Sequence, residues 1–134
     1  MKVKGYIFSR PFMGERVPQS VQNLVLRNYC LNNNLIFELS STEYSMENSY
    51  YVLNKLIDDK KYKKIIFYSM FQLPNNNEKR LKTLKKIIEK KKSIYFALED
   101  QILKNTSNIE EIENIWFIKK VSKHCAKSQE VKLN

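Results

Sequence analysis

The sequence predicts a single α/β domain, a three-layer sandwich in which helices cover both faces of a four-stranded parallel sheet. Short apolar runs of strand length alternate with segments of helical periodicity, which is typical of right-handed βαβ crossovers. Two of the runs are continuously apolar, as expected for strands that are buried on both sides. We expect the strand order 2-1-3-4, a flavodoxin-like order, with strands over residues 3–8, 35–39, 64–68 and 94–98.

Four segments have the apolar spacing of amphipathic helices. The first covers residues 18–32, with Pro18 suited to its first turn, and the second covers residues 49–59. The third begins at Asn75 and the last near Ser107, and each has a glutamate three residues later, which is typical of a helix N-terminus. We expect the first helix to face the core with Val21, Leu24, Val25 and Tyr29.

The chain has the size of one domain, with 134 residues of which 43% are hydrophobic. We assign the domain to residues 1–125 and expect the polar residues 126–134 to form a fraying tail. No apolar run approaches the length of a membrane span, and the N-terminus lacks the apolar segment of a signal peptide. We therefore expect a soluble, cytoplasmic protein with no membrane insertion.

The net charge is +10, and clustered lysines can neutralise nucleic-acid phosphates. Lysine and asparagine are abundant throughout, however, and there are only two glycines, which is the bias of AT-rich codons. Lysines of that origin mostly cover solvated faces. Specific nucleic-acid binding is therefore not expected, although DNA binding stays open as an alternative.

The sequence offers no pattern for a metal or a nucleotide cofactor. Cys30 and Cys125 are the only cysteines, and His124 beside Cys125 does not supply the three or four convergent ligands of a zinc site. Gly5 and Gly14 are the only glycines, so neither a dinucleotide-binding turn nor a P-loop is present. We expect no cofactor.

Polar side chains follow each of the four predicted strands. Because the carboxyl ends of parallel strands meet at one edge of the sheet, and ligands bind at that edge, these residues predict a shared site. Helix capping is the alternative explanation. The residues are Ser9, Arg10 and the loop to Gln19 after the first strand, Ser40 to Tyr44 after the second, Ser69 and Gln72 after the third, and Glu99 and Asp100 after the fourth.

Two arginines in the first of these loops, Arg10 and Arg16, predict a site for a carboxylate or phosphate, because a planar guanidinium binds such groups bidentately. An internal ion pair with Glu15 or Glu43 is the alternative for them.

The remaining candidates have weaker assignments. Catalytic roles fall to Glu43 and Glu99, as acid or base, and to Ser9, as a nucleophile only if a base activates it. Ligand contacts fall to Gln19, Gln22, Tyr44 and Ser69, and each of these could also face water, cap a helix or cover the core.

The loop and the strand exits resemble the sporadic carbohydrate cluster protein family of bacterial surface-glycan loci. The main block is Ser9-Arg10-Pro11-Phe12-Met13-Gly14-Glu15-Arg16-Val17-Pro18-Gln19, and the shorter ones are Thr42-Glu43-Tyr44, Phe67-Tyr68-Ser69, Leu73-Pro74, Ala97-Leu98-Glu99-Asp100 and Ile115-Trp116. The resemblance implies a role in surface polysaccharide or nonulosonate biosynthesis, with an anionic sugar or nucleotide sugar as ligand.

A weaker, fold-level likeness is to the catalytic domain of serine recombinases, the resolvase family. It is carried by Gly5-Tyr6 through Ser9, the segment from Gln19 to Cys30, and the segment from Tyr51 to Tyr68. After their third strand those enzymes have arginines for the scissile phosphate, whereas this chain has Ser69-Met70-Phe71-Gln72-Leu73-Pro74. The likeness therefore implies a resolvase-like fold more than recombination.

Three functions follow as expectations. The leading one is an enzyme, or an enzyme-like protein of unknown reaction, that acts on an anionic sugar. The alternatives are a non-catalytic accessory module for a glycosyltransferase and a degenerate resolvase-like DNA binder. The aromatic residues Tyr50, Tyr51, Trp116 and Phe117 also indicate a homo-oligomer through the last helix.

Overall fold

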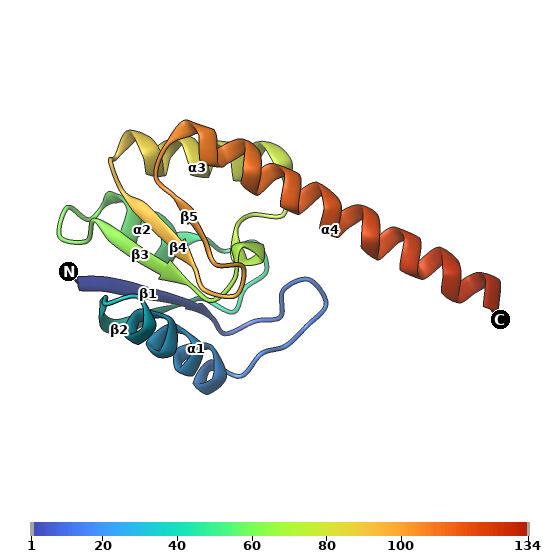
Figure 1. Ribbon diagram of the computed structural model, residues 1–134, viewed down its shortest axis with the longest axis horizontal. Helices are drawn as coiled ribbons and strands as arrows, with labels where there is room; N and C mark the ends of the chain where they lie inside the picture. Colours follow the sequence, from blue (N-terminus) through green and yellow to red (C-terminus); the bar gives the residue numbers. More distant parts are fainter. Residues whose placement is uncertain (1, 134) are drawn as a thin grey trace.

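The computed structural model describes the backbone of residues 2–133 and the side chains of residues 2–122. Its centre is a five-stranded sheet of order β2-β1-β3-β4-β5 (Figure 1). The first four strands in this order are parallel, and the last pairs antiparallel with β4. The strands are β1 (Lys2–Phe8), β2 (Ile36–Glu43), β3 (Lys64–Phe67), β4 (Ser93–Phe96) and β5 (Gln101–Leu103).

Helices cover both faces of this sheet, as the sequence predicts. The helix α1 (Gln19–Asn32) lies on one face, and α2 (Tyr51–Asp58) and α3 (Asn77–Glu89) lie on the other. A short 3-10 turn, η1 (Met70–Gln72), follows β3. The last helix, α4 (Thr106–Leu133), packs its first part against α3 and β5, and its second part extends away from the body (Figure 1).

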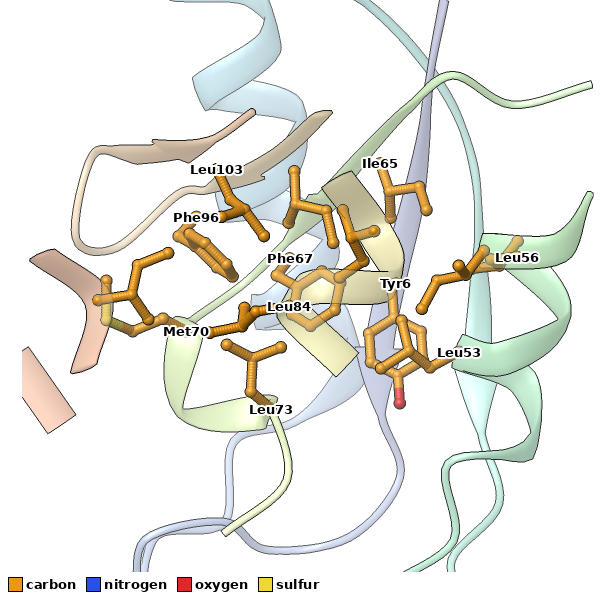
Figure 2. Close-up of a cluster of buried hydrophobic side chains, with 14 of the residues drawn as sticks. Tyr6, Leu53, Leu56, Ile65, Phe67, Met70, Leu73, Leu84, Phe96 and Leu103 are labelled. Atoms are coloured by element: carbon orange, nitrogen blue, oxygen red, sulfur yellow. The ribbon is translucent and has the colours of Figure 1, made fainter. Parts of the chain in front are cut away.

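The core consists of two hydrophobic clusters, one on each side of the sheet, because successive strand residues point to opposite faces. Tyr6 and Phe8 of β1 face the larger cluster, which α2, α3 and α4 complete, and Ile7 between them faces the smaller cluster under α1. Figure 2 shows the larger cluster, in which strand residues such as Phe67 and Phe96 meet Leu53 and Leu56 of α2 and Leu84 of α3.

The fifth strand corrects the prediction of a four-stranded sheet. β5 has only three residues, and it returns antiparallel to β4 after a four-residue connection, residues 97–100. Asp100 in this connection has a φ of 51°, a left-handed conformation that aspartate tolerates better than most residues. A strand this short carries no periodicity, so the sequence pattern could not reveal it.

The buried face of α1 also differs from the prediction. Val21 and Leu24 were expected in the core, yet 41% and 65% of their surfaces are exposed. The buried residues are Gln22, Leu26 and Cys30, spaced four apart on one stripe. Gln22 can occupy this stripe because its amide makes four hydrogen bonds inside the protein.

The last helix is longer than predicted. It begins at Thr106, one residue before the expected start, and it continues to Leu133 through the segment for which the sequence predicts a polar tail. Its first turn is held by the Asn108 side chain, whose Oδ1 accepts hydrogen bonds from the amides of Lys104 and Asn105. The side chains of His124 and Cys125 lie outside the described residues. No helix in the described chain combines the length and the apolar character needed to cross a membrane.

Candidate functional site

The polar residues predicted at the strand exits do gather at the carboxyl edge of the sheet, but most of them bind one another. Ser9, directly after β1, donates its hydroxyl to the backbone oxygen of Glu43 at the end of β2, at 2.8 Å. This hydrogen bond joins two neighbouring strand exits. Among the described residues, no base contacts the Ser9 hydroxyl, so no group there would activate it as a nucleophile. The geometry favours a structural role for Ser9.

Glu43 is buried, with 1% of its surface exposed, and its carboxylate is surrounded by donors. It accepts the Tyr6 hydroxyl at 2.8 Å and the amides of Val52 and Leu53, in the first turn of α2, at 3.1 Å each. Burial, with Glu43 as the next cause, raises the pKa of the Tyr6 hydroxyl well above its ordinary value. Glu43 therefore acts as an internal acceptor that anchors α2.

Gln22 and Gln72 form a buried amide bridge across the strand ends. Gln22 Oε1 accepts from the Phe8 amide at 3.0 Å and from Gln72 Nε2 at 2.9 Å. Gln22 Nε2 donates to the backbone oxygens of Phe8 and Val17, at 2.9 Å each. Since both side chains are completely buried, Gln22 has no free group to offer a ligand.

Glu99 and Ser69 meet at the exits of β4 and β3. The Ser69 hydroxyl and the Met70 amide each donate to the half-buried Glu99 carboxylate at 2.8 Å. Burial raises the pKa of Glu99, while these two hydrogen bonds act in the opposite direction. The carboxylate organises the first residues of η1, which explains why both residues carry polar side chains here.

Arg10 is held differently from every other predicted site residue. Its guanidinium lies 4.2 Å from the Phe8 ring centroid and 5.1 Å from that of Tyr50. Nη1 donates to the backbone oxygens of Tyr44, at 2.8 Å, and Met46, at 3.2 Å. Nη2 is buried and has no partner at hydrogen-bond geometry among the described residues, but the Tyr50 hydroxyl lies close enough for Arg10 to oppose the rise that burial causes in the pKa of Tyr50.

The other candidates of the first two loops stay on the surface. Arg16 and Gln19 are exposed, and neither side chain makes a hydrogen bond or ion pair in the part of the chain that the structure describes. Tyr44 is 51% exposed and its ring packs 5.8 Å from the ring of Tyr51. The structure thus gives Arg10 and Arg16, which the sequence treated as a pair, different environments: Arg10 is partly buried and hydrogen-bonded, and Arg16 is exposed.

A cleft of about 300 Å³ lies beside Arg10. Its apolar walls include Phe8, Phe12, Phe71 and Leu73, and its polar side chains are Arg10, Glu47, Asn48, Tyr50 and Asn75. Trp116 of α4 closes one side. Of the predicted site residues, Arg10 alone lines this cleft; Glu43 and Glu99 do not.

Trp116 is one of the aromatic residues from which a homo-oligomer was expected, but it is buried within the domain, with only 1% of its surface accessible. Its ring contacts Phe71 edge-on, with centroids 5.0 Å apart, and the Arg80 guanidinium lies 4.2 Å from its centroid. Arg80 is itself fixed by Glu113, at 2.6 Å. The indole Nε1 is buried without a partner in the described structure.

Sequence reasoning missed Glu47, Asn48, Asn75 and Trp116 as residues that line the cleft. The sequence does place Trp116 on the apolar stripe of the last helix, but which loops that stripe meets depends on how the helix crosses the domain. Among the residues that the structure describes, no three histidine, cysteine, aspartate or glutamate side chains cluster in a way that could hold a metal ion.

Comparison with solved structures gives the class of fold. A resolvase family site-specific recombinase from Streptococcus pneumoniae superposes with a TM-score of 0.62 at 10% identity, over 98% of this chain and 97% of that one. The N-terminal catalytic domain of TP901-1 integrase superposes with a TM-score of 0.60 at 14% identity, over 91% and 98%. The chain therefore has a resolvase-like α/β fold, and at these identities the likeness carries no function.

No protein-family model matches this sequence, and no curated protein matches it significantly. The resemblance to the carbohydrate cluster family consequently has no support from these sequence comparisons. Function must be argued from the cleft.

Proposed function

We propose that this protein binds an anionic sugar in the cleft beside Arg10, as a component of surface polysaccharide or nonulosonate biosynthesis. The observation that carries the proposal is the unpartnered Nη2 of Arg10. A buried donor without a partner costs about 1–3 kcal/mol, and more if it is charged, so an acceptor on a ligand would recover this free energy.

The surroundings of Arg10 fix the guanidinium before any ligand arrives. Phe8 and Tyr50 hold its plane by cation–π contacts, and two backbone oxygens occupy Nη1. The donor left over is therefore preorganised, which reduces the entropy lost on binding. Since Nη2 is closed to solvent, ligand access requires a side-chain movement in the wall of the cleft.

The other walls suit a sugar ring. Small-molecule sites combine apolar surface with a few polar groups that fix orientation. Phe12 and Phe71 offer aromatic surface to the C–H groups of a ring, and Asn48 and Asn75 offer amides that can both donate to and accept from hydroxyls. This combination favours a sugar over a purely aliphatic acid.

The geometry supports binding better than catalysis. Glu43 and Glu99, the carboxylates considered for proton transfer, are engaged inside the protein and do not line the cleft. Glu47, which does line it, is exposed. We therefore favour the accessory-module form of the hypothesis, in which the protein holds a sugar for a partner enzyme.

Paired arginine variants test the proposal. Arg10→Lys keeps the charge but loses the planar fork, and we expect its affinity for sugar acids or sugar phosphates, measured by calorimetry, to fall by about 1–3 kcal/mol. Arg16→Lys is the matched control, because Arg16 is exposed in the same loop and should bind as the wild type does. Equal affinities in the two variants, both confirmed as folded by circular dichroism, would refute the proposal.

The resolvase-like fold and the net charge of +10 favour DNA binding as a second candidate. Ser69-Met70-Phe71-Gln72-Leu73-Pro74 after β3 contains no arginine to hold a phosphate, which argues against the recombinase reaction.

A further inference from the structure

We infer that the ligand is one monosaccharide ring bearing a single carboxylate, and that the indole N–H of Trp116 is a second donor to it. This inference rests on the proposed function and narrows it. Two buried side-chain donors in the described structure lack partners, Arg10 Nη2 and Trp116 Nε1, and both residues line the same cleft.

The Trp116 indole is an unusual donor to leave unpaired. Buried tryptophan N–H groups usually find a hydrogen-bond partner, and this side chain is 99% buried. The position of its ring is fixed by Phe71, which is a wall of the cleft, and by Arg80, which lies over the ring and is held by Glu113. A neutral, directional donor of this kind suits a hydroxyl or a carboxylate oxygen.

The charge around the cleft limits the charge of the ligand. Arg10 is the one basic residue among the described residues that line it, and Glu47 carries the opposite charge. A carboxylate carries one negative charge, which the Arg10 guanidinium alone can neutralise. A phosphate carries about −1.5 to −2, and the diphosphate of a nucleotide sugar would face Glu47 with a single cation to neutralise it.

The size of the cleft also favours a ligand of one sugar ring. Its volume of about 300 Å³ is at the lower end of ligand sites, which span roughly 300–1,000 Å³. One sugar ring uses such a volume, whereas a nucleotide sugar would leave most of its length outside. The two donors come from different parts of the fold, the exit of β1 and the helix α4, so one ring would bridge them.

The chain carries its own reporter, because Trp116 is the only tryptophan. Titration of the wild-type protein with D-glucuronate, glucose 6-phosphate, glucose and UDP-glucose, followed by tryptophan emission and by calorimetry, tests the charge and size of the ligand. We expect a saturable change with D-glucuronate at lower concentration than with the other three.

A variant tests the donor. Trp116→Phe keeps an aromatic ring against Phe71 and Arg80 but loses the N–H, and we expect calorimetry to give a roughly two- to tenfold weaker affinity for D-glucuronate. Phe117→Leu, at the exposed neighbouring position, is the matched control and should leave the affinity unchanged.

The outcomes separate this inference from the proposed function. Tighter binding of glucose 6-phosphate or UDP-glucose would overturn the single-carboxylate inference while leaving an anionic sugar site in place. Full affinity in Trp116→Phe would overturn the role of the indole. Absence of binding by every anionic sugar would overturn the proposed function and this inference together.

Discussion

At the scale of single residues, two glutamates show how a strand-exit carboxylate can be used for structure. Glu43 accepts hydrogen bonds from a tyrosine hydroxyl and from the first amides of α2, while Glu99 accepts from Ser69 and from the amide of Met70. Both were candidates for proton transfer on the basis of their positions. Their neighbours instead make Glu43 an anchor for α2, which follows it, and Glu99 an anchor for η1, which precedes it in the chain.

Glu99 should give the stability a measurable pH dependence. Burial raises its pKa in the folded protein above the ordinary value of 4.5, so the folded state binds the proton more tightly than the unfolded chain does. Between the two pKa values the folded state carries more protons, and the free energy of unfolding should therefore fall as the pH rises through that window. Urea denaturation at a series of pH values measures this slope.

The variant Glu99→Gln isolates the contribution of this carboxyl, because it removes the titrating group. The difference in unfolding free energy between wild type and variant should change between pH 4.5 and the higher pKa that Glu99 has in the folded protein. A difference that stays constant with pH would show that Glu99 titrates alike in the folded and unfolded states.

The sequence located the polar residues of the carboxyl edge but not their partners. Ser9, Glu43, Ser69 and Glu99 lie at this edge because a parallel sheet brings its strand ends together. Which of them faces a ligand depends on side-chain directions set by distant contacts, such as that between Tyr6 and Glu43. No local pattern encodes those contacts, and for the same reason Arg10 and Arg16 looked equivalent.

At the scale of elements, β1 and β2 pair with an irregularity that requires a glycine. The register passes from Lys4 opposite Glu38 to Tyr6 opposite Ser41, so β2 contains one extra residue. Gly5 stands at this irregularity. A Cβ there would collide with the hydroxyl of Ser40 and lie 2.9 Å from Phe37 Cε1 and 3.1 Å from the Ser40 Cα.

We expect Gly5→Ala to destabilise the domain by about 1–3 kcal/mol, because the neighbouring strand must move to admit the methyl group. Chemical denaturation measures the loss. Ser40→Gly in the same chain should restore part of the stability, since it removes the hydroxyl that the new methyl group meets. An unchanged midpoint in Gly5→Ala would show that β2 adjusts without cost.

Long elements with a clear apolar period were predictable from the sequence, whereas a very short strand and a buried polar residue within a helix were not. The four parallel strands and four helices follow from apolar spacing. The three-residue β5 carries too few residues for a period, and α1 buries Gln22 where the pattern predicts an apolar side chain. The cost of burying Gln22 is offset by four hydrogen bonds, one of them from Gln72, 50 positions away, and the local sequence does not display these partners.

At the scale of the whole molecule, the extended part of α4 carries unpartnered apolar side chains. Phe117, Ile118 and Val121 of α4 are 68%, 61% and 44% exposed, and the later part of this helix extends away from the body (Figure 1). We expect two copies to pair through this region, which would bury these side chains. Light scattering at tens of micromolar should give twice the chain mass of 16.0 kDa.

Charge substitution tests this pairing. Ile118→Glu should shift the protein to monomer, whereas Leu24→Glu, at an equally exposed apolar position on α1, should leave the mass unchanged. Wild-type protein that scatters as a monomer at these concentrations would contradict the expectation.

DNA binding should be weak and independent of sequence. The lysines are spread over the surface, and the segment from Ser69 to Pro74 directly after β3 contains no arginine, so phosphate contacts are electrostatic and are lost as salt competes. We expect gel-shift complexes at low salt to disappear near physiological salt, with a random duplex as the comparison. Tight, sequence-selective complexes at that salt would restore the recombinase-like alternative.

The Gln22–Gln72 bridge determines how the loop of the cleft can move. The side chain of Gln22 binds the backbone of Phe8, just before the loop, and the backbone of Val17, at its end. Both ends of the loop are therefore fixed to α1. Gln72, the last residue of η1, donates to the side-chain oxygen of Gln22 and so links η1 to α1. Ser9 and Arg10 are also held by the exit of β2 and the loop after it, so any movement that admits a ligand beside Arg10 is confined to the residues from Pro11 to Arg16, while the strands and both helical layers keep their places.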